Sequence, residues 1–225
     1  MTIAILAGGA ASRMGGADKA SLPLNGRRII DRQVETLRHV SDSIIVVGGQ
    51  PDRFRDLGVR AVPDVYADCG ALGGIYSALL ASDRPWTLVL ACDMPFLSLP
   101  LLQRLTRVPA PGVDMVMPRT HDGPQPLCAA YAARCADAVR RRIERGLLKA
   151  ASLAEDVRVE EIGPEELATY DPDGLMFVNV NTPHDYERAK NVIDRMPESD
   201  AATRNRITDA ETRPSSDCHR APDRT

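Results

Sequence analysis

The residues best suited to chemistry are charged side chains beside a glycine-rich turn. Gly8 and Gly9 follow a short apolar run, and Arg13 and Lys19 come soon after them. Glycine lets backbone N–H groups approach an anion closely and adopts positive φ without a steric penalty. Such a turn with two nearby cations is typical of a loop that surrounds phosphate groups. A turn needed only for tight packing is the alternative.

A carboxylate near the middle of the chain is the natural partner of such a loop. Asp93 follows the apolar run 88–92 and precedes Met94-Pro95, which ends that run. Ligands of open parallel sheets bind beyond the carboxyl ends of the strands. Mg²⁺ prefers oxygen ligands and usually takes one or two carboxylates, with phosphate oxygens and water completing its shell. Asp93 is therefore the expected metal ligand, and capping of the following helix is the alternative.

Two better-known phosphate-binding loops do not fit this sequence. A P-loop requires Gly-Lys-Ser/Thr, but Lys19 stands between Asp18 and Ala20. A dinucleotide fingerprint requires G-x-G-x-x-G and an acidic residue after the second strand, where this chain has Gly48. An NAD-dependent oxidoreductase is accordingly a weak second class.

Composition narrows the choice of partners and compartment. The 225 residues carry a net charge of -3, which argues against a general nucleic-acid or anionic-membrane binder. The five cysteines form no C-x-x-C pair and are odd in number, so a reducing cytoplasm is expected. The apolar run 3–7 is too short to span a bilayer and has no basic segment before it, which predicts a strand and not a signal.

The elements that must position these residues alternate between two periodicities. Short apolar runs typical of buried strands alternate with segments whose apolar residues recur every three or four positions. The expected strands are 3–6, 43–47, 59–62, 86–92 and 113–117, and the expected helices are 28–40, 72–80 and 99–105. This alternation predicts an α/β fold of three layers, with a mainly parallel, mixed sheet between helices.

The second half of the chain is less regular. We expect a basic helix over 134–145, strands over 158–162 and 176–180, and a last helix that starts at Thr182-Pro183. Asn179 and Asn181 would share one face of the extended segment. Residues 197–225 are polar and nearly free of aliphatic side chains, so we expect a disordered tail after a single domain spanning 1–196.

Five segments together resemble one family. The stretch LAGGAASRMGGADKASLPLNG is similar to the signature of nucleotidyltransferases with a Rossmann-like fold, in the molybdenum cofactor guanylyltransferase branch. The segments VPDVYADCGALGGIYSAL, LACDMPFL, GPQPLCAAY and FVNVNTPHDYERA follow in the family's order and extend the resemblance over about residues 2–195.

The resemblance implies a reaction and a set of site residues. GMP would pass from GTP to the molybdenum–molybdopterin cofactor with release of pyrophosphate, Mg²⁺ would be required, and molybdoenzymes or chaperones would be possible partners. Arg13, Lys19 and Asp93 would be catalytic, and Asp93 would bind the metal. The implied nucleotide-binding residues are Leu6, Ala7, Gly8, Gly9, Lys19, Asp64 and Asp93, and Asn179 and Asn181 would meet the pterin.

One position departs from the family, and other functions stay open. Several relatives carry Asn where this chain has Gly48, which is therefore only a weak candidate for nucleotide binding. A cytidylyltransferase acting on the same pterin is the nearest rival, although such relatives tend to read LAAG where this chain has Gly9 after Gly8. A sugar-phosphate nucleotidyltransferase and a non-catalytic homologue that binds nucleotide or delivers the cofactor are further alternatives.

Overall fold

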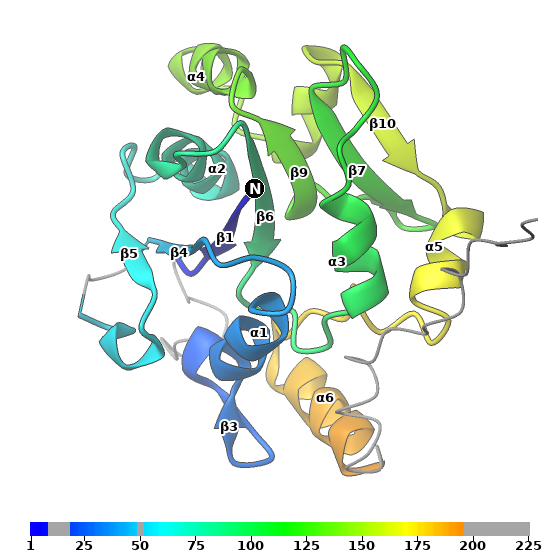
Figure 1. Cartoon of the computed structure of the whole chain (residues 1–225). Coiled ribbons are helices and arrows are strands. Elements are labelled where there is room, and N and C mark those ends of the chain that lie inside the picture. The colour runs from blue at the N-terminus through cyan, green and yellow to red at the C-terminus, as the bar shows by residue number, and fades with distance from the viewer. Residues whose placement is uncertain (9–18, 49–51, 196–225) are drawn as a thin grey trace, which may run out of the picture.

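An eight-stranded sheet forms the centre of the protein (Figure 1). The computed structural model describes residues 1–8, 19–48 and 52–195. The strand order is β10-β7-β9-β6-β1-β4-β5, and β8 pairs with β7. The strands are β1 (Thr2–Leu6), β4 (Ile44–Val47), β5 (Arg60–Val62), β6 (Trp86–Ala91), β7 (Met115–Thr120), β8 (Gly123–Pro124), β9 (Cys128–Ala132) and β10 (Val159–Ile162).

Most of the strand pairs are parallel. β1 runs parallel to both β4 and β6, with Leu6 opposite Val47 on one side and Ala91 on the other. β5 runs parallel to β4, whereas β9 is antiparallel to β6 and β7. The sheet is thus mixed and mainly parallel, as predicted. The carboxyl ends of β1, β4, β5 and β6 therefore meet along one edge, which we call the carboxyl edge.

Helices cover both faces of the sheet. In β1, Ile3 and Ile5 pack in the apolar cluster that contains residues of α1 and α3, whereas Ala4 and Leu6 pack with α2 and α4. This alternation follows from the two-residue period of a strand and confirms the three layers. The helices are α1 (Ile29–Leu37), α2 (Gly70–Ala81), α3 (Leu99–Leu105), α4 (Cys135–Glu144), α5 (Pro164–Tyr170) and α6 (Pro183–Arg195).

A third, smaller cluster holds the last helix against the start of the chain. Ala189 and Ile193 of α6 pack with Leu24 in the hairpin formed by β2 (Pro23–Leu24) and β3 (Arg27–Arg28). The helix starts as expected, because the Thr182 hydroxyl accepts a hydrogen bond from Asp185 N (3.1 Å) and the Asp185 carboxylate accepts one from Thr182 N (2.9 Å). Among the residues that the structure describes, every helix is too short or too polar to traverse a lipid bilayer.

One predicted strand is wrong. Residues 176–180 form a turn and an irregular segment, in which Val178 N donates to Leu175 O at 3.1 Å. Val180 N donates instead to Asp93 O at 2.9 Å, so the segment crosses the end of β6 and adds no strand to the sheet. Helix α5 was not predicted, and the tail 197–225 lies outside the described residues.

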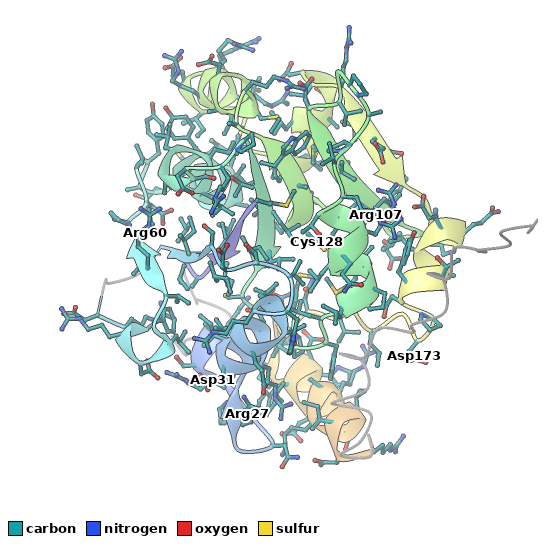
Figure 2. The ribbon with its side chains drawn as sticks, viewed as in Figure 1. Arg27, Asp31, Arg60, Arg107, Cys128 and Asp173 are labelled. Atoms are coloured by element: carbon teal, nitrogen blue, oxygen red, sulfur yellow. The ribbon has the colours of Figure 1, made fainter. Side chains whose placement is uncertain are left out.

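Side chains between the layers are buried, and most charged side chains lie at the outside of the molecule. Figure 2 shows Cys128 in the interior, whereas Arg60 and Asp173 lie at the periphery. Burial raises the pKa of the Cys128 thiol, which keeps it protonated. The four described cysteines are free thiols.

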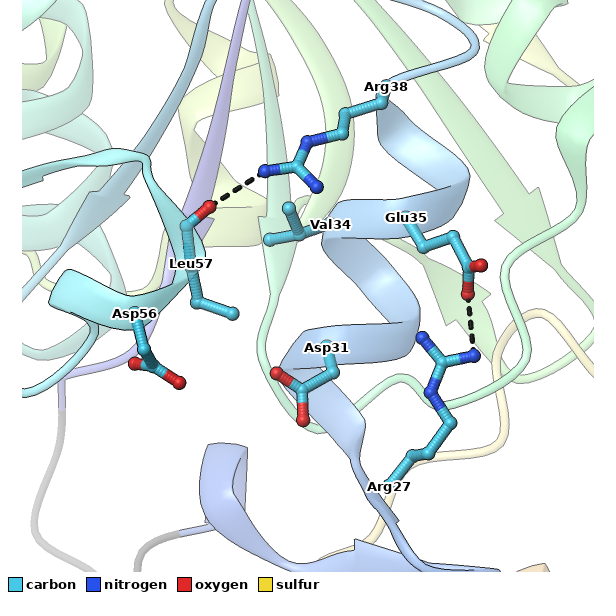
Figure 3. Close-up of a pocket in the computed structure, with 7 residues that line it drawn as sticks. All are labelled: Arg27, Asp31, Val34, Glu35, Arg38, Asp56 and Leu57. Atoms are coloured by element: carbon cyan, nitrogen blue, oxygen red, sulfur yellow. Dashed lines mark hydrogen bonds and ion pairs between the residues drawn. The ribbon is translucent and has the colours of Figure 1, made fainter.

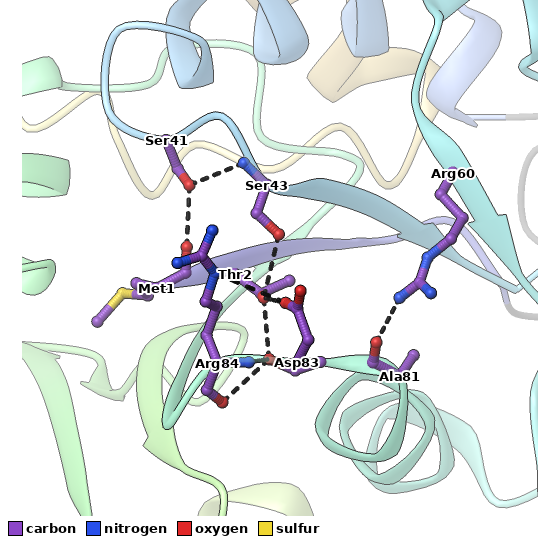
Figure 4. Close-up of polar contacts among 9 residues, drawn as sticks. Met1, Thr2, Ser41, Ser43, Arg60, Ala81, Asp83 and Arg84 are labelled. Carbon is purple, nitrogen blue, oxygen red and sulfur yellow. Dashed lines mark hydrogen bonds and ion pairs between the residues drawn. The ribbon is translucent and has the colours of Figure 1, made fainter.

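The opposite, amino edge of the sheet carries a polar network (Figure 4). Thr2 Oγ1 lies 3.2 Å from Ser43 Oγ and accepts a hydrogen bond from Ser82 Oγ at 2.9 Å. It also lies 3.5 Å from the carboxylate of Asp83. The Ser41 hydroxyl donates to Met1 O at 2.9 Å. These polar groups therefore satisfy one another.

Candidate active site

Two glycines and a carboxylate form a close-fitting cradle at the carboxyl edge. Gly8 follows β1 and Gly48 follows β4, with a φ of 85° at Gly48. A Cβ on Gly48 would lie 2.6 Å from Gly8 Cα, and a Cβ on Gly8 would lie 2.9 Å from Asp64 Oδ2. Gly48 has no room for a side chain, because the obstructing atoms are backbone, whereas the atom nearest to a Cβ on Gly8 is the end of the Asp64 side chain. The ends of β1 and β4 therefore approach each other closely beside the Asp64 carboxylate, with Gly48 buried and Gly8 exposed, and the exposed backbone of Gly8 allows the close approach of a nucleotide.

The cradle is fixed by the sheet that carries it. Ala7 N donates to Val47 O at 2.8 Å, and Gly48 N donates to Val62 O at 2.9 Å. These bonds continue the parallel ladder one residue beyond β1 and β4. Gly48, a weak candidate on sequence grounds, therefore belongs to the same cradle as Gly8.

A second cluster joins three segments that are far apart in the sequence. Lys19 begins the short 3-10 turn η2 (Lys19–Ser21). Its ammonium lies 2.5 Å from Asn181 Oδ1 and 3.5 Å from Asp93 Oδ2. An ammonium has three donors, and these two contacts use two of them. Three predicted site residues are thus brought into direct contact.

Burial changes the acidity of both carboxylates. The pKa of Asp93 is raised because burial disfavours its charged form, although the nearby Lys19 ammonium acts in the opposite direction. Burial likewise raises the pKa of Asp64. Carboxyl groups whose pKa is shifted by burial are candidates for a functional site.

The segment that crosses β6 adds a second amide to the cluster. Asn179 Oδ1 is buried and has no hydrogen-bond partner within the described part of the chain. Asn179 and Asn181 are not on an extended strand, so the predicted shared face is absent. Asn181 contacts Lys19, whereas the Asn179 oxygen is an acceptor in need of a donor or a cation.

The donor set is compatible with a hard divalent cation. The described residues contain no group of three or more His, Cys, Asp or Glu side chains that could enclose a metal. Mg²⁺ commonly needs only one or two carboxylates when phosphate oxygens complete its shell. Asp93 at the carboxyl edge and the unpartnered oxygen of Asn179 are oxygen donors of that kind. The residues present therefore fit Mg²⁺.

Sequence reasoning missed a cation at this edge. Arg53 Nη1 donates to Ala7 O at 3.3 Å, and its guanidinium lies 4.8 Å from the centre of the Phe54 ring. Burial lowers the pKa of Arg53. Burial also raises the pKa of Cys92 to about 12, and Lys19 and Arg53 both act to lower it. Both cations therefore lie within electrostatic reach of Cys92, which links the cradle to the Lys19 cluster.

The other predicted nucleotide-binding and catalytic residues are Leu6, Ala7, Gly9 and Arg13. Leu6 and Ala7 are almost fully buried, and Leu6 O accepts a hydrogen bond from Cys92 N at 3.2 Å. Their side chains belong to the core, so they can meet a ligand only through the backbone. Gly9 and Arg13 lie outside the described residues.

A hollow on the outer face of α1 contains none of the predicted residues (Figure 3). It has a volume of about 300 Å³ and is lined by Arg27, Asp31, Val34, Glu35, Arg38, Asp56 and Leu57. Its charged groups bond within the protein: Arg27 Nη1 lies 2.8 Å from Glu35 Oε2, and Arg38 Nη2 donates to Leu57 O at 2.7 Å. This hollow is therefore separate from the site at the carboxyl edge.

Comparison with known proteins points to one family. The family model described as "MobA-like NTP transferase domain" matches residues 3–159. A molybdenum cofactor guanylyltransferase of Desulfosudis oleivorans is 32% identical, over 84% of this chain and 94% of its own length. A probable molybdenum cofactor guanylyltransferase of Pelotomaculum thermopropionicum is 36% identical, over 83% of this chain and 90% of its own length.

A solved structure agrees with these relatives. The molybdopterin-guanine dinucleotide biosynthesis protein A of Archaeoglobus fulgidus superposes with a TM-score of 0.75 at 29% identity. The match covers 87% of this chain and all of that protein. The similarity thus extends beyond the glycine-rich loop to the whole three-layer fold.

Proposed function

This chain belongs to the family of MobA-like NTP transferase domains, and we propose that it transfers GMP from GTP to the molybdenum–molybdopterin cofactor. The products are the guanine dinucleotide form of the cofactor and pyrophosphate. The observation that carries the proposal is the contact of Lys19 with both Asp93 and Asn181 at the carboxyl edge. That contact joins a phosphate-binding cation, a metal-binding carboxylate and an amide for the second substrate.

The reaction is a substitution at phosphorus. A phosphate oxygen of the pterin forms a bond to the α-phosphorus of GTP, the bond to the bridging oxygen breaks, and pyrophosphate leaves with that electron pair. Little covalent chemistry falls to the protein, so positioning and charge stabilisation dominate. Lys19 and Arg13 offset the negative charge of the phosphates. The cradle of Gly8 and Gly48 admits the nucleotide beside Asp64.

Asp93 holds Mg²⁺ in this proposal. When bound there, Mg²⁺ would neutralise negative charge on the triphosphate and on the leaving pyrophosphate. The raised pKa of Asp93 is consistent with a half-buried carboxylate that is better accommodated once a cation is bound. Asn179 and Asn181 meet the pterin substrate, to which their amide nitrogens can donate hydrogen bonds. We assign the transferase unit to residues 1–196 and its reaction to the cytoplasm.

Pyrophosphate release tests the assignment of both substrates. Purified protein with Mg²⁺ is given GTP, CTP, ATP or UTP, each with and without molybdenum–molybdopterin. Release is expected with GTP only when the pterin is present, and it should stop when EDTA removes the metal. Preferential use of CTP would instead make the protein a cytidylyltransferase. Nucleotide binding without turnover in every mixture would make it a non-catalytic delivery homologue.

A further inference from the structure

A fully buried polar side chain lies behind Asp93. Gln33 is 0% exposed in α1 and shares the apolar face formed by Ile30, Val34 and Leu37. Its Nε2 donates to Ala91 O at 2.8 Å and to Met94 O at 3.0 Å. The side-chain amide nitrogen of Gln33 thus donates both of its protons to backbone carbonyls at and just after the end of β6.

These two carbonyls bracket Asp93. Ala91 is the last residue of β6, and Met94 directly follows Asp93. On its other side, Asp93 O accepts the hydrogen bond from Val180 N. The backbone that carries the carboxylate is therefore held from α1 by Gln33 and from the segment before α6 by Val180.

The orientation of the Gln33 amide follows from its partners. If the amide were rotated by 180°, Oε1 would face the two carbonyl oxygens, and neither carbonyl can donate a hydrogen bond to it. In the orientation observed, Oε1 is buried and has no partner in the part of the chain that the structure describes. An apolar residue of similar size would fill this space without burying an unpaired oxygen. What glutamine adds is therefore its pair of donors.

We propose that Gln33 is a positioning residue that fixes the 91–94 turn so that the Asp93 carboxylate is preorganised for the metal. The inference rests on the proposed function, because it assigns Asp93 as the metal ligand. A carboxylate on a loosely held turn must be ordered when the metal binds, which weakens binding. Groups that orient a metal ligand typically contribute 10- to 100-fold in metal affinity or activity.

The variant Gln33→Met tests the proposal, because it keeps the size of the side chain and removes both donors. We expect the Mg²⁺ concentration for half-maximal turnover to rise about 10- to 100-fold. The KM for GTP measured at saturating Mg²⁺ should change much less. Independently of turnover, hydrogen exchange at the Val180 amide, measured without metal or nucleotide, should become faster than in the unmodified protein.

A neighbour on the same helix provides the matched control. Val34→Ala removes buried apolar volume beside Gln33 and leaves the Ala91 and Met94 carbonyls untouched. It should lower the Tm without changing the Mg²⁺ requirement or the exchange of Val180. If Gln33→Met does not fold, Gln33→Asn carries the same comparison with an amide one methylene shorter, and a partial loss is expected.

The outcomes separate this proposal from the proposed function. Suppose that the unmodified protein turns over, and that Gln33→Met has the same Mg²⁺ requirement and the same rate of hydrogen exchange at Val180 as the unmodified protein. That result would overturn only the role of Gln33. Equal effects from Val34→Ala would overturn it too, because they would reduce Gln33 to a general contribution to stability. If the unmodified protein does not turn over, the proposed function fails. The exchange of Val180 then decides whether Gln33 holds the turn.

Discussion

The two edges of the sheet differ in how far their polar groups are hydrogen-bonded within the protein. At the amino edge, the hydroxyls of Ser43 and Ser82 both bond to the hydroxyl of Thr2 (Figure 4). At the carboxyl edge, desolvation raises the pKa of the Asp64 and Asp93 carboxyls, and Asn179 has a buried oxygen without a partner among the described residues. Several strand ends meet at each edge, and among the described residues the polar groups at the carboxyl edge are less completely matched than those at the amino edge.

This difference in hydrogen bonding indicates that the two edges have different roles. Polar groups that satisfy one another contribute to stability, whereas buried groups without a match reduce it until a ligand compensates them. The separation is not complete: the Thr87 hydroxyl, opposite Thr2 in the sheet, is buried without a partner among the described residues. Substitutions at the carboxyl edge should therefore affect activity first, and those at the amino edge should affect stability.

The largest effect is expected from Asp93→Asn. This change keeps the shape of the side chain and removes the metal-binding charge, so turnover should fall by about 100- to 1000-fold. The Tm should stay the same or rise, because the raised pKa means that burial makes the carboxylate costly to ionise. Asp83→Asn at the amino edge is the control and should leave turnover unchanged. Near-normal, Mg²⁺-dependent turnover of Asp93→Asn would contradict the metal assignment.

A somewhat smaller effect is expected from Lys19→Met. The variant removes the ammonium that lies between Asp93 and Asn181 and keeps much of the length of the side chain. We expect kcat to fall by about 100-fold, since a cation that stabilises developing charge acts mainly in the transition state. Steady-state kinetics with GTP measures this. A rise in KM with kcat unchanged would instead show that Lys19 only binds the nucleotide.

The cradle should be sensitive to a single methyl group. In Gly48→Ala the new Cβ would lie 2.6 Å from Gly8 Cα at a positive φ, so we expect a loss of about 2–3 kcal/mol in unfolding free energy. Gly26→Ala is matched to it, with a φ of 73° and no atom within 4 Å of the added Cβ. Urea unfolding should show a smaller loss for Gly26→Ala, of about 1 kcal/mol. Equal losses would mean that the close approach of the two strands contributes nothing.

The smallest effect is expected at the amino end of β7. Asp114 accepts a hydrogen bond from Arg158 N at 2.8 Å and pairs with Arg134. The Arg158 amide and the Arg134 guanidinium lower the pKa of this carboxyl below its ordinary value. A lowered pKa contributes stability above the unfolded-state pKa of about 3.9, and this contribution disappears as the pH falls through the folded-state pKa.

The variant Asp114→Asn should therefore lose about 1 kcal/mol at pH 7, and the difference from the unmodified protein should shrink below about pH 4. Thermal unfolding at several pH values measures this difference. Turnover at pH 7 should not change. A loss of stability that is the same at every pH would show that the charge of Asp114 is not the cause.

Much of the fold was predictable because it depends on local patterns. The strands around Ile5 and Val46 are short apolar runs, and the period of α1 separates a buried from an exposed face. Burial of Gln33 on that apolar face could have been noticed, since a polar residue there needs a specific partner. The prediction of a strand over 176–180 was wrong, because a short apolar run that packs over the end of a strand has the same sequence pattern as a run within a strand.

The sequence by itself determined the three-layer α/β class and the position of Asp93 after an apolar run, because periodicity and chain order are local properties. Only the tertiary structure decided that Lys19 contacts Asn181, 162 residues away, and that Gly8 approaches Gly48 beside Asp64. It also decided that Gln33 holds the turn of Asp93. These contacts depend on strand order and on the crossing of separate segments, which no local pattern specifies.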